Sequence, residues 1–312
     1  MTLEQVAEWK ENLQKLVQQG PQMVPAIADF LKKNQDIDFG ASGKQALGYS
    51  SARRAMFDAL AQIGGPEASG ALTQVLQDSA DPHEISALAD ALAKAAPGQH
   101  TAEVLQAAHD VLGMAAGGKL PNEDVGPLFE VLQRYGDQSV TADLENDSSR
   151  WKYYSAMALA NLPDGAGVPS LIRMLDDNSG NKLSALQMLA QVANQYPEAR
   201  TALLDQARGN KIAANFWPYL IDGLAGREYH YSNSENGAAP TSFEDLKSTS
   251  IKFGNQNYYT VPSPSSASQE FVDARLAIIN DLKSATSDPA ARGALEQSQL
   301  ELTGRLPKIT AK

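Results

Sequence analysis

The chain of 312 residues contains no cysteine. This absence excludes disulfide bonds, thiolate metal sites and a cysteine nucleophile. The chain also lacks an apolar run of about 18 to 20 residues, because charged residues interrupt every apolar stretch. We therefore expect a soluble protein with no direct membrane insertion. The composition leaves open whether the protein works in the cytoplasm or in a bacterial extracytoplasmic compartment.

Basic charge is also scarce. The chain has 26 Lys and Arg residues against 37 Asp and Glu residues, which gives a formal net charge of −11, and it has no Lys/Arg-rich block. A chain with this charge is repelled by a nucleic-acid backbone and by an anionic membrane surface. The sequence therefore excludes nucleic acid as the main partner and favours a partner that carries basic patches.

Residue patterns typical of catalytic and metal sites are absent as well. No two of the four histidines have the spacing of three or four residues that places both on one helical face: His83, His100, His109 and His230. The segment from Gly40 to Lys44 falls short of a phosphate-binding loop, because Asp38 stands where the first glycine is needed and Gln45 follows the lysine. We therefore expect no metal, no cofactor and no enzymatic activity.

The chain between Ser51 and Gly226 has helical periodicity. Apolar residues recur at steps of three and four, as in Leu72, Val75 and Leu76, and short Gly/Pro/Asp breakers separate stretches of about ten to fifteen residues. Proline at these points suits the first turn of a helix, and glycine suits the residue that ends the previous one. The pattern predicts an all-α fold of helices joined by tight turns.

One segment, which is expected to form two helices joined by a tight turn, occurs twice. Residues 59–78 align without a gap on residues 158–177, with six identical positions. A paired-helix unit with an irregular period resembles the HEAT/armadillo-type repeats. The resemblance covers about residues 50–226 and implies a right-handed α-solenoid that binds other macromolecules. That family shares no catalytic residue that could be carried over to this chain.

The remaining segments complete a four-part organisation. Residues 1–49 are expected to form an N-terminal helical cap and a loop, and residues 50–226 the HEAT-like repeats. Residues 227–269 are rich in Ser, Asn, Pro and Gly, yet they hold six of the 18 Tyr and Phe residues of the chain. Because disordered segments are poor in aromatics, we predict a long irregular loop packed on the repeats. Residues 270–312 are expected to form a C-terminal helical pair.

Candidate binding residues fall into two groups. In a HEAT-like repeat the second helix of each pair lines the concave face, which points to Thr73, Gln74 and Arg173. A basic residue at a helix start, Arg53, is a further candidate for contact with a carboxylate or phosphate.

The second group is aromatic. Exposed Trp and Tyr side chains on a rigid scaffold are common binding anchors, which makes Trp151, Tyr154 and Trp217 candidates. The competing interpretation is that Trp151 and Tyr154 fill a gap between repeats and that Trp217 docks the long loop.

The sequence favours a non-catalytic scaffold that holds a protein or peptide on the concave face of a HEAT-like solenoid. Two alternatives stay open. Some HEAT-like proteins are enzymes, including bilin lyases and alkylpurine DNA glycosylases, so the resemblance does not exclude catalysis. The chain could also be a structural spacer module of a longer, extracytoplasmic protein.

Overall fold

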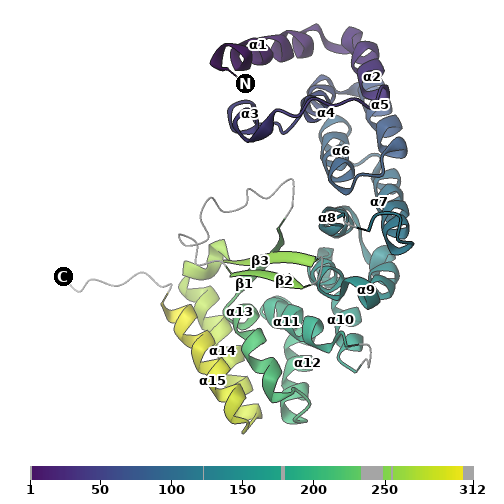
Figure 1. Cartoon of the computed structure of the whole chain (residues 1–312). Helices are drawn as coiled ribbons and strands as arrows, with labels where there is room; N and C mark the ends of the chain where they lie inside the picture. Colours follow the sequence, from purple (N-terminus) through teal and green to yellow (C-terminus); the bar gives the residue numbers. More distant parts are fainter. Residues whose placement is uncertain (1, 122, 177–179, 233–248, 254–255, 305–312) are drawn as a thin grey trace, which may run out of the picture. The chain divides into compact units, whose positions relative to one another are not determined.

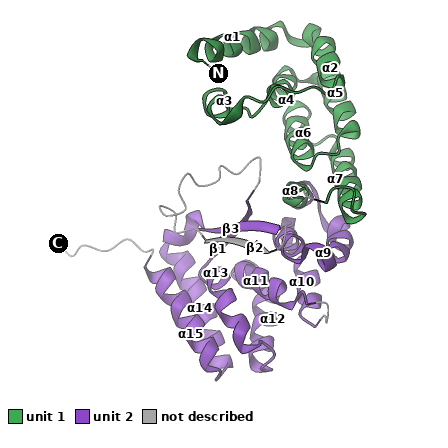
Figure 2. Ribbon diagram, in the orientation of Figure 1, with its two compact units in different colours: residues 1–131 green, residues 132–312 purple. Residues whose placement is uncertain are grey.

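A computed structural model describes residues 2–121, 123–176, 180–232, 249–253 and 256–304 (Figure 1). The chain divides into two compact units, residues 1–131 and residues 132–312, which Figure 2 colours separately. The described residues are mostly helical, as the sequence predicts, and one small sheet is added in the second unit. The right-handed solenoid stays a prediction.

Unit 1 is built from helices of eight to 17 residues. Their bounds are α1 Leu3–Gln19, α2 Val24–Lys32, α3 Gly40–Leu47, α4 Ala52–Ile63, α5 Gly65–Asp78, α6 Pro82–Ala95 and α7 Thr101–Ala116, with a 3-10 turn at Gly20–Met23. Helix α8, Gly126–Tyr135, crosses the boundary between the units. Helix α3 lies in a segment for which the sequence predicts only a polar loop.

The turns of unit 1 follow from local sequence. The Asp81 carboxylate accepts hydrogen bonds from the backbone N–H groups of His83 and Glu84, and Pro82 occupies the first helical position, so α6 begins here. Gly64 ends α4 with a φ of 67°, a conformation that favours glycine. Short turns of this kind place consecutive helices side by side.

Helices α4 to α7 pack against one another. Helix α4 contacts α5 and α6, and α5 contacts α6, α7 and also α2. Helices α4 and α5 therefore each contact the next helix along the chain and the one after it. Apolar side chains fill the space between these helices, and those of Phe57, Leu60, Leu72, Ile85 and Leu88 are at most 2% exposed.

Unit 2 combines helices with a sheet. Its helices are α9 Thr141–Ala160, α10 Val168–Met174, α11 Lys182–Val192, α12 Pro197–Arg208, α13 Ile221–Leu224, α14 Gln269–Ala285 and α15 Pro289–Thr303. Short 3-10 turns lie at Gln138–Val140, Pro163–Gly165, Ala214–Leu220 and Pro264–Ala267. The last two helices, α14 and α15, match the C-terminal helical pair expected from the sequence.

The segment 227–269 contains strands, so the prediction of an irregular loop is wrong for much of it. Strands β1 Arg227–Tyr231, β2 Thr249–Phe253 and β3 Gln256–Pro262 form an antiparallel sheet in the order β1-β3-β2. Residues 233–248, which join β1 to β2, lie outside the described residues. The physical reason for the error is that aromatic and β-branched residues favour a pleated surface that packs against a helix.

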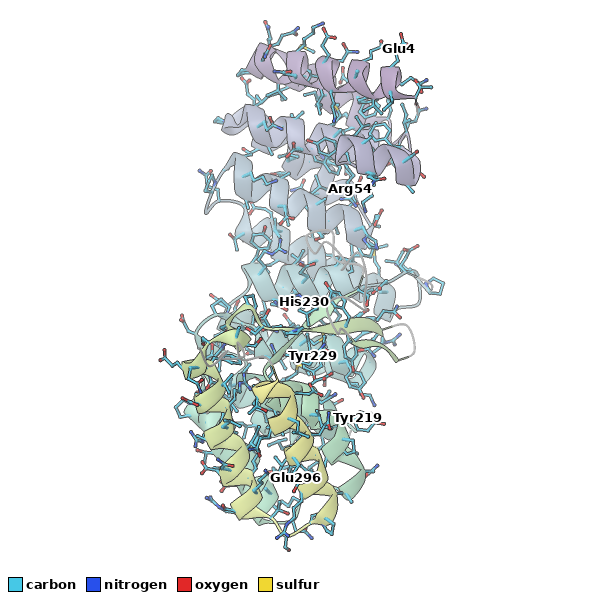
Figure 3. All side chains as sticks on the ribbon, turned by 90° about the vertical axis from the view of Figure 1, so that its left-hand side faces the viewer. Glu4, Arg54, Tyr219, Tyr229, His230 and Glu296 are labelled. Atoms are coloured by element: carbon cyan, nitrogen blue, oxygen red, sulfur yellow. The ribbon has the colours of Figure 1, made fainter. Side chains whose placement is uncertain are left out.

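Burial alternates along β1, whereas Tyr258, Tyr259 and Thr260 of β3 are all buried. On β1, Tyr229 and Tyr231 are buried while His230 is half-buried, and Figure 3 labels Tyr229 and His230 on opposite sides of the strand. Tyr231 pairs with Tyr258 of β3 in the register. The Tyr258 ring lies 5.4 Å from the ring of Tyr153 on α9. Tyr258, one of the aromatic residues of the segment 227–269, therefore joins the sheet to α9.

Helix α9 is kinked where it meets the sheet. Trp151 has non-helical backbone angles, with φ −122° and ψ 53°, so a new helical segment effectively begins after it. The side-chain oxygen Oε1 of Gln256 accepts hydrogen bonds from the backbone N–H groups of Tyr153 (3.0 Å) and Tyr154 (3.2 Å). Gln256 of β3 therefore caps this segment as an N-cap residue does, but from a distant part of the chain.

Substitution Gln256→Ala removes the shared acceptor of two buried N–H groups. We expect it to lower the free energy of unfolding by about 2 kcal/mol, because unpaired buried donors are costly. Urea denaturation followed by circular dichroism measures this loss. The control is Gln297→Ala on an exposed face of α15, which should change stability by less than about 0.5 kcal/mol. Equal stability of the two variants would show that Gln256 does not cap α9.

Candidate functional site

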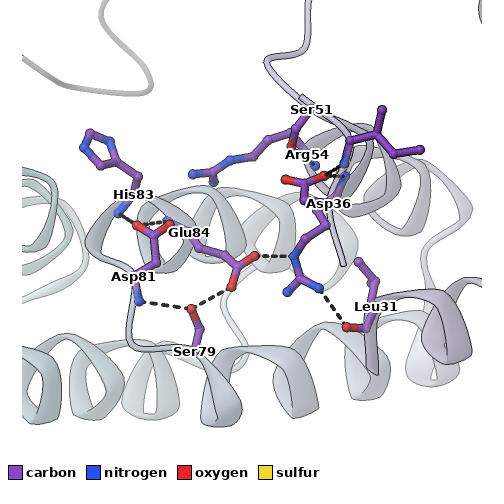
Figure 4. A network of polar contacts seen from close by, with 10 residues as sticks. Leu31, Asp36, Ser51, Arg54, Ser79, Asp81, His83 and Glu84 are labelled. Carbon is purple, nitrogen blue, oxygen red and sulfur yellow. Dashed lines mark hydrogen bonds and ion pairs between the residues drawn. The ribbon is translucent and has the colours of Figure 1, made fainter. Parts of the chain in front are cut away.

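The polar network around Arg53 is the most buried charged cluster that we describe in unit 1 (Figure 4). Arg53 is 6% exposed, its Nε donates to Oε1 of Glu84 at 2.7 Å, and its Nη1 donates to the carbonyl oxygen of Leu31 at 2.7 Å. Its guanidinium also lies 5.7 Å from the centre of the Phe57 ring. Arg53 thus links α4 to the start of α6 and the end of α2. The prediction that Arg53 binds a partner at the surface is wrong, because burial and these contacts occupy its charge.

A hollow of about 620 Å³ lies beside this network. We call it the acidic hollow. It opens where the end of α2, the start of α4, the last turn of α5 and the α5–α6 turn meet. Its lining consists of Leu31, Lys32, Asn34, Asp36, Arg53, Gln74, Val75, Asp78, Ser79, Ala80, Asp81 and Glu84. The volume falls in the range of ligand sites in proteins, about 300 to 1,000 Å³.

The charge of the acidic hollow is uncompensated. Within the described residues, three of its four carboxylates accept hydrogen bonds only from neutral donors. Asp36 accepts from two backbone N–H groups, Asp78 from the Gln74 side-chain amide, and Asp81 from two backbone N–H groups at the start of α6. Only Glu84 is paired with a cation, Arg53. Apart from Arg53, Lys32 is the one basic residue of the lining, so the hollow attracts positive charge.

A second hollow, the α5–α7 groove, adjoins the first. It measures about 470 Å³ and shares Ser79 with the acidic hollow. Buried Leu76 and Val111 and half-buried Met114 supply apolar surface, and the exposed residues Glu103 and Asp110 are its charged groups. The lining contains no basic residue. The groove therefore suits a chain that presents both apolar and cationic side chains.

The second-helix candidates are divided between the units, with Thr73 and Gln74 in unit 1 and Arg173 in unit 2. Gln74 is exposed and lines the acidic hollow, where its Nε2 donates to Asp78 at 3.3 Å. Thr73 is half-buried, and its hydroxyl donates to the backbone oxygen of Ser69 at 2.9 Å. Arg173 belongs to unit 2, where its exposed side chain contacts Glu145 and Ser170. Only Gln74 therefore lies in a described hollow with a free face toward solvent.

The aromatic candidates are core residues. Trp151, Tyr154 and Trp217 are 3%, 0% and 1% exposed, so the prediction that they anchor a partner is wrong. Trp151 stands at the kink in α9, and the two tyrosines after it, Tyr153 and Tyr154, lie against β3. The Tyr154 hydroxyl accepts a hydrogen bond of 2.7 Å from the backbone N–H of Asn257. The competing interpretation, that these rings fill internal space, agrees with their burial.

The buried tyrosines of the sheet are not chemically activated. Burial raises the pKa of Tyr258 well above its usual range, and the neighbouring rings and Asp222 act in the same direction. Burial likewise raises the pKa of Tyr229, with Asp222 as the next contributor. Both phenols therefore stay neutral at physiological pH and serve as packing groups.

Sequence reasoning missed the acidic residues that line the hollows. Acidic residues are plentiful in this chain, so no single one stands out. One signal was available: Gln74 with Asp78 and Gln106 with Asp110 are spaced by four residues, and both pairs are hydrogen-bonded. Gln–Asp pairs at this spacing stabilise a helix and hold the carboxylate in place.

Comparisons with protein-family models, with curated proteins and with solved structures find no match for this chain. In the described part of the chain, no helix is both long enough and apolar enough to cross a membrane. Among the same residues, no three His, Asp or Glu side chains are grouped as a metal site requires. The geometry of the hollows is therefore the basis for a functional proposal.

Substitution Arg53→Met leaves Glu84 buried without its cation. We expect a loss of about 3 kcal/mol in the free energy of unfolding, since breaking a buried pair strands a charge. The double variant Arg53→Met/Glu84→Gln should recover part of this loss, and urea denaturation measures both. Lys33→Met, an exposed cation nearby, is the control and should be near neutral. A double variant no more stable than Arg53→Met would contradict a direct coupling of the two charges.

Proposed function

We propose that unit 1 is a non-catalytic binding module that holds a basic segment of a protein partner in the acidic hollow and the α5–α7 groove. The observation that carries this proposal is the pair of adjoining hollows, in which, within the described residues, four of six carboxylates lie beside no cationic side chain or histidine; Glu84 is paired with Arg53, and Glu103 lies 3.4 Å from Nδ1 of His100. Together their linings contain six acidic residues and two basic ones, and one of the basic residues, Arg53, is already paired. Apolar surface between the carboxylates favours a polypeptide over a bare cation.

The distribution of charge along the chain supports the same partner. Residues 1–131 contain nine Lys and Arg against 17 Asp and Glu, a formal charge of −8 out of −11 for the whole chain. An acidic surface of this kind speeds the encounter with a cationic partner and repels nucleic acid. The acidity is therefore concentrated in the unit that holds the two hollows.

We also infer that α4 to α7 are two HEAT-like helix pairs and belong to an α-solenoid. The support is the contact pattern, in which α4 meets α6 and α5 meets α7. In such a repeat the second helices form the binding face, and α5 contributes to both hollows. The resemblance and the charge thus favour the same surface for the partner.

Neutralisation of the hollows tests the proposal. The probe is a fluorescein-labelled dodecapeptide that alternates lysine and alanine, and fluorescence anisotropy measures its affinity for the full chain. The site variant removes three charges from the hollows: Asp78→Asn, Glu103→Gln and Asp110→Asn. We expect binding about tenfold weaker, because each exposed charge contributes on the order of 0.5 kcal/mol.

A matched control separates a site from general attraction. It removes three exposed carboxylates of unit 1 that line neither hollow, and so it has the same net charge as the site variant: Glu4→Gln, Glu67→Gln and Glu123→Gln. We expect its affinity to stay within about twofold of the original chain. Equal weakening in both variants, or no weakening in the site variant, would overturn the proposal.

A further inference from the structure

A third hollow of unit 1 combines two aromatic rings with two carboxylates. It has a volume of about 470 Å³ and lies between α1 and the segment that precedes α3. We call it the Trp9 pocket. Its lining consists of Gln5, Glu8, Trp9, Asn12, Ile37, Asp38 and Phe39, and it contains no basic residue. No residue of α1 is fully buried, so its side of the pocket stays accessible.

The two rings form a corner. Trp9 and Phe39 meet edge to face, with ring centroids 4.9 Å apart and an angle of 69° between their planes. Phe39 is 5% exposed, whereas Trp9 is half-buried, so the indole presents part of its surface to the pocket. Aromatic faces attract an ammonium or guanidinium group, and indole does so most strongly. The corner therefore offers a cationic side chain an apolar contact for its stem and a ring face for its head.

The two carboxylates are available to pair with such a head. Within the described residues, Glu8 makes no hydrogen bond or ion pair, and Asp38 accepts a hydrogen bond from the backbone N–H of Gly40 at 2.8 Å. Both side chains are exposed. The two carboxylates of the lining carry two negative charges, and no cation of the lining offsets them. The pocket therefore favours a positively charged ligand over a neutral or anionic one.

We propose that the Trp9 pocket binds a lysine side chain of the partner, with the ammonium held between the Trp9 ring and the carboxylates of Glu8 and Asp38. This inference deepens the proposed function and rests on it for the identity of the ligand as part of a basic polypeptide. Residues 34–39 connect the two sites, because Asn34 and Asp36 line the acidic hollow while Ile37, Asp38 and Phe39 line the pocket. One extended basic segment can therefore reach both.

The first test uses a model compound with one lysine side chain, so its result does not depend on the acidic hollow or the α5–α7 groove. Nα-acetyl-lysine methylamide is titrated into the full chain while tryptophan fluorescence is followed, with the norleucine analogue as the neutral counterpart. Trp151 and Trp217 are buried in unit 2, so a change reports on Trp9. We expect a saturable change for the lysine compound, with a dissociation constant on the order of 1 mM, and a response at least fivefold weaker for norleucine.

Charge variants make the titration specific. The double variant Glu8→Gln/Asp38→Asn should weaken lysine binding about fivefold, because it removes both counter-charges and retains the shape of the side chains. Glu4→Gln, on α1 but outside the pocket (Figure 3), is the control and should change affinity less than twofold. Equal responses to lysine and norleucine, or no effect of the double variant, would overturn the inference.

The lysine/alanine dodecapeptide links the two proposals. Trp9→Leu should weaken its binding about fivefold, whereas Trp9→Phe, which keeps a ring, should retain most of it; circular dichroism checks that α1 stays folded in both. Peptide binding that depends on the hollows, without a lysine response at Trp9, would refute this inference alone. A lysine response in a chain that does not bind the peptide would refute the proposed function and leave the pocket standing.

Discussion

The ion pair between Arg53 and Glu84 is the interaction on which the functional surface of unit 1 depends. Both groups are almost inaccessible to water, with side-chain exposures of 7% and 13%. Removing two charges from water is costly, and the cost is offset only when geometry and further hydrogen bonds are good. Here Arg53 also donates to the last turn of α2, and Glu84 also accepts from the Ser79 hydroxyl at 2.7 Å. The pair therefore fixes the positions of α2, α4, α5 and α6 around the acidic hollow.

This arrangement also decides the sign of the surface. Arg53 is inside the network, so it neutralises a buried carboxylate and leaves the exposed ones without a cation. The lining as a whole therefore stays negative, with four carboxylates against Lys32 and Arg53.

The sequence predicts those parts of the fold that are determined locally. Asp81 with Pro82, the glycines before Pro66, and Gly20 with Pro21 mark helix ends by the chemistry of the backbone, and the helices begin and end there. The sheet is different, because β1 gains its partner only after the chain returns as β3, with register set across about 30 residues. No local pattern specifies that pairing, and Ser, Asn and Gly around the strands conceal it.

The errors on single residues have the same origin. The ion-pair partner of Arg53, Glu84, lies 31 positions later in the chain. Trp151 is turned inward by a kink in α9, and the helical segment after the kink is capped by Gln256, more than 100 positions away. Helical spacing alone assigns Trp151 and Tyr153 to different faces, and that holds only while the helix is regular. Where long-range contacts reshape an element, its periodicity no longer tells which side chains are exposed.

Our proposal of a basic polypeptide as the partner of unit 1 combines these points. Its three hollows lie on helices whose positions are fixed by buried contacts, while their carboxylates accept mostly neutral hydrogen bonds that leave the charge intact. A preorganised acidic surface loses little conformational entropy when a ligand binds. In the binding mode that we propose, the ligand supplies the missing cations. The acidic hollow and the α5–α7 groove share Ser79, and the Trp9 pocket is lined by residues 37–39, next in the chain to Asp36 of the acidic hollow, so the spacing between the cations of the ligand would determine how many hollows it fills. Specificity in such a site comes from that spacing more than from any single contact.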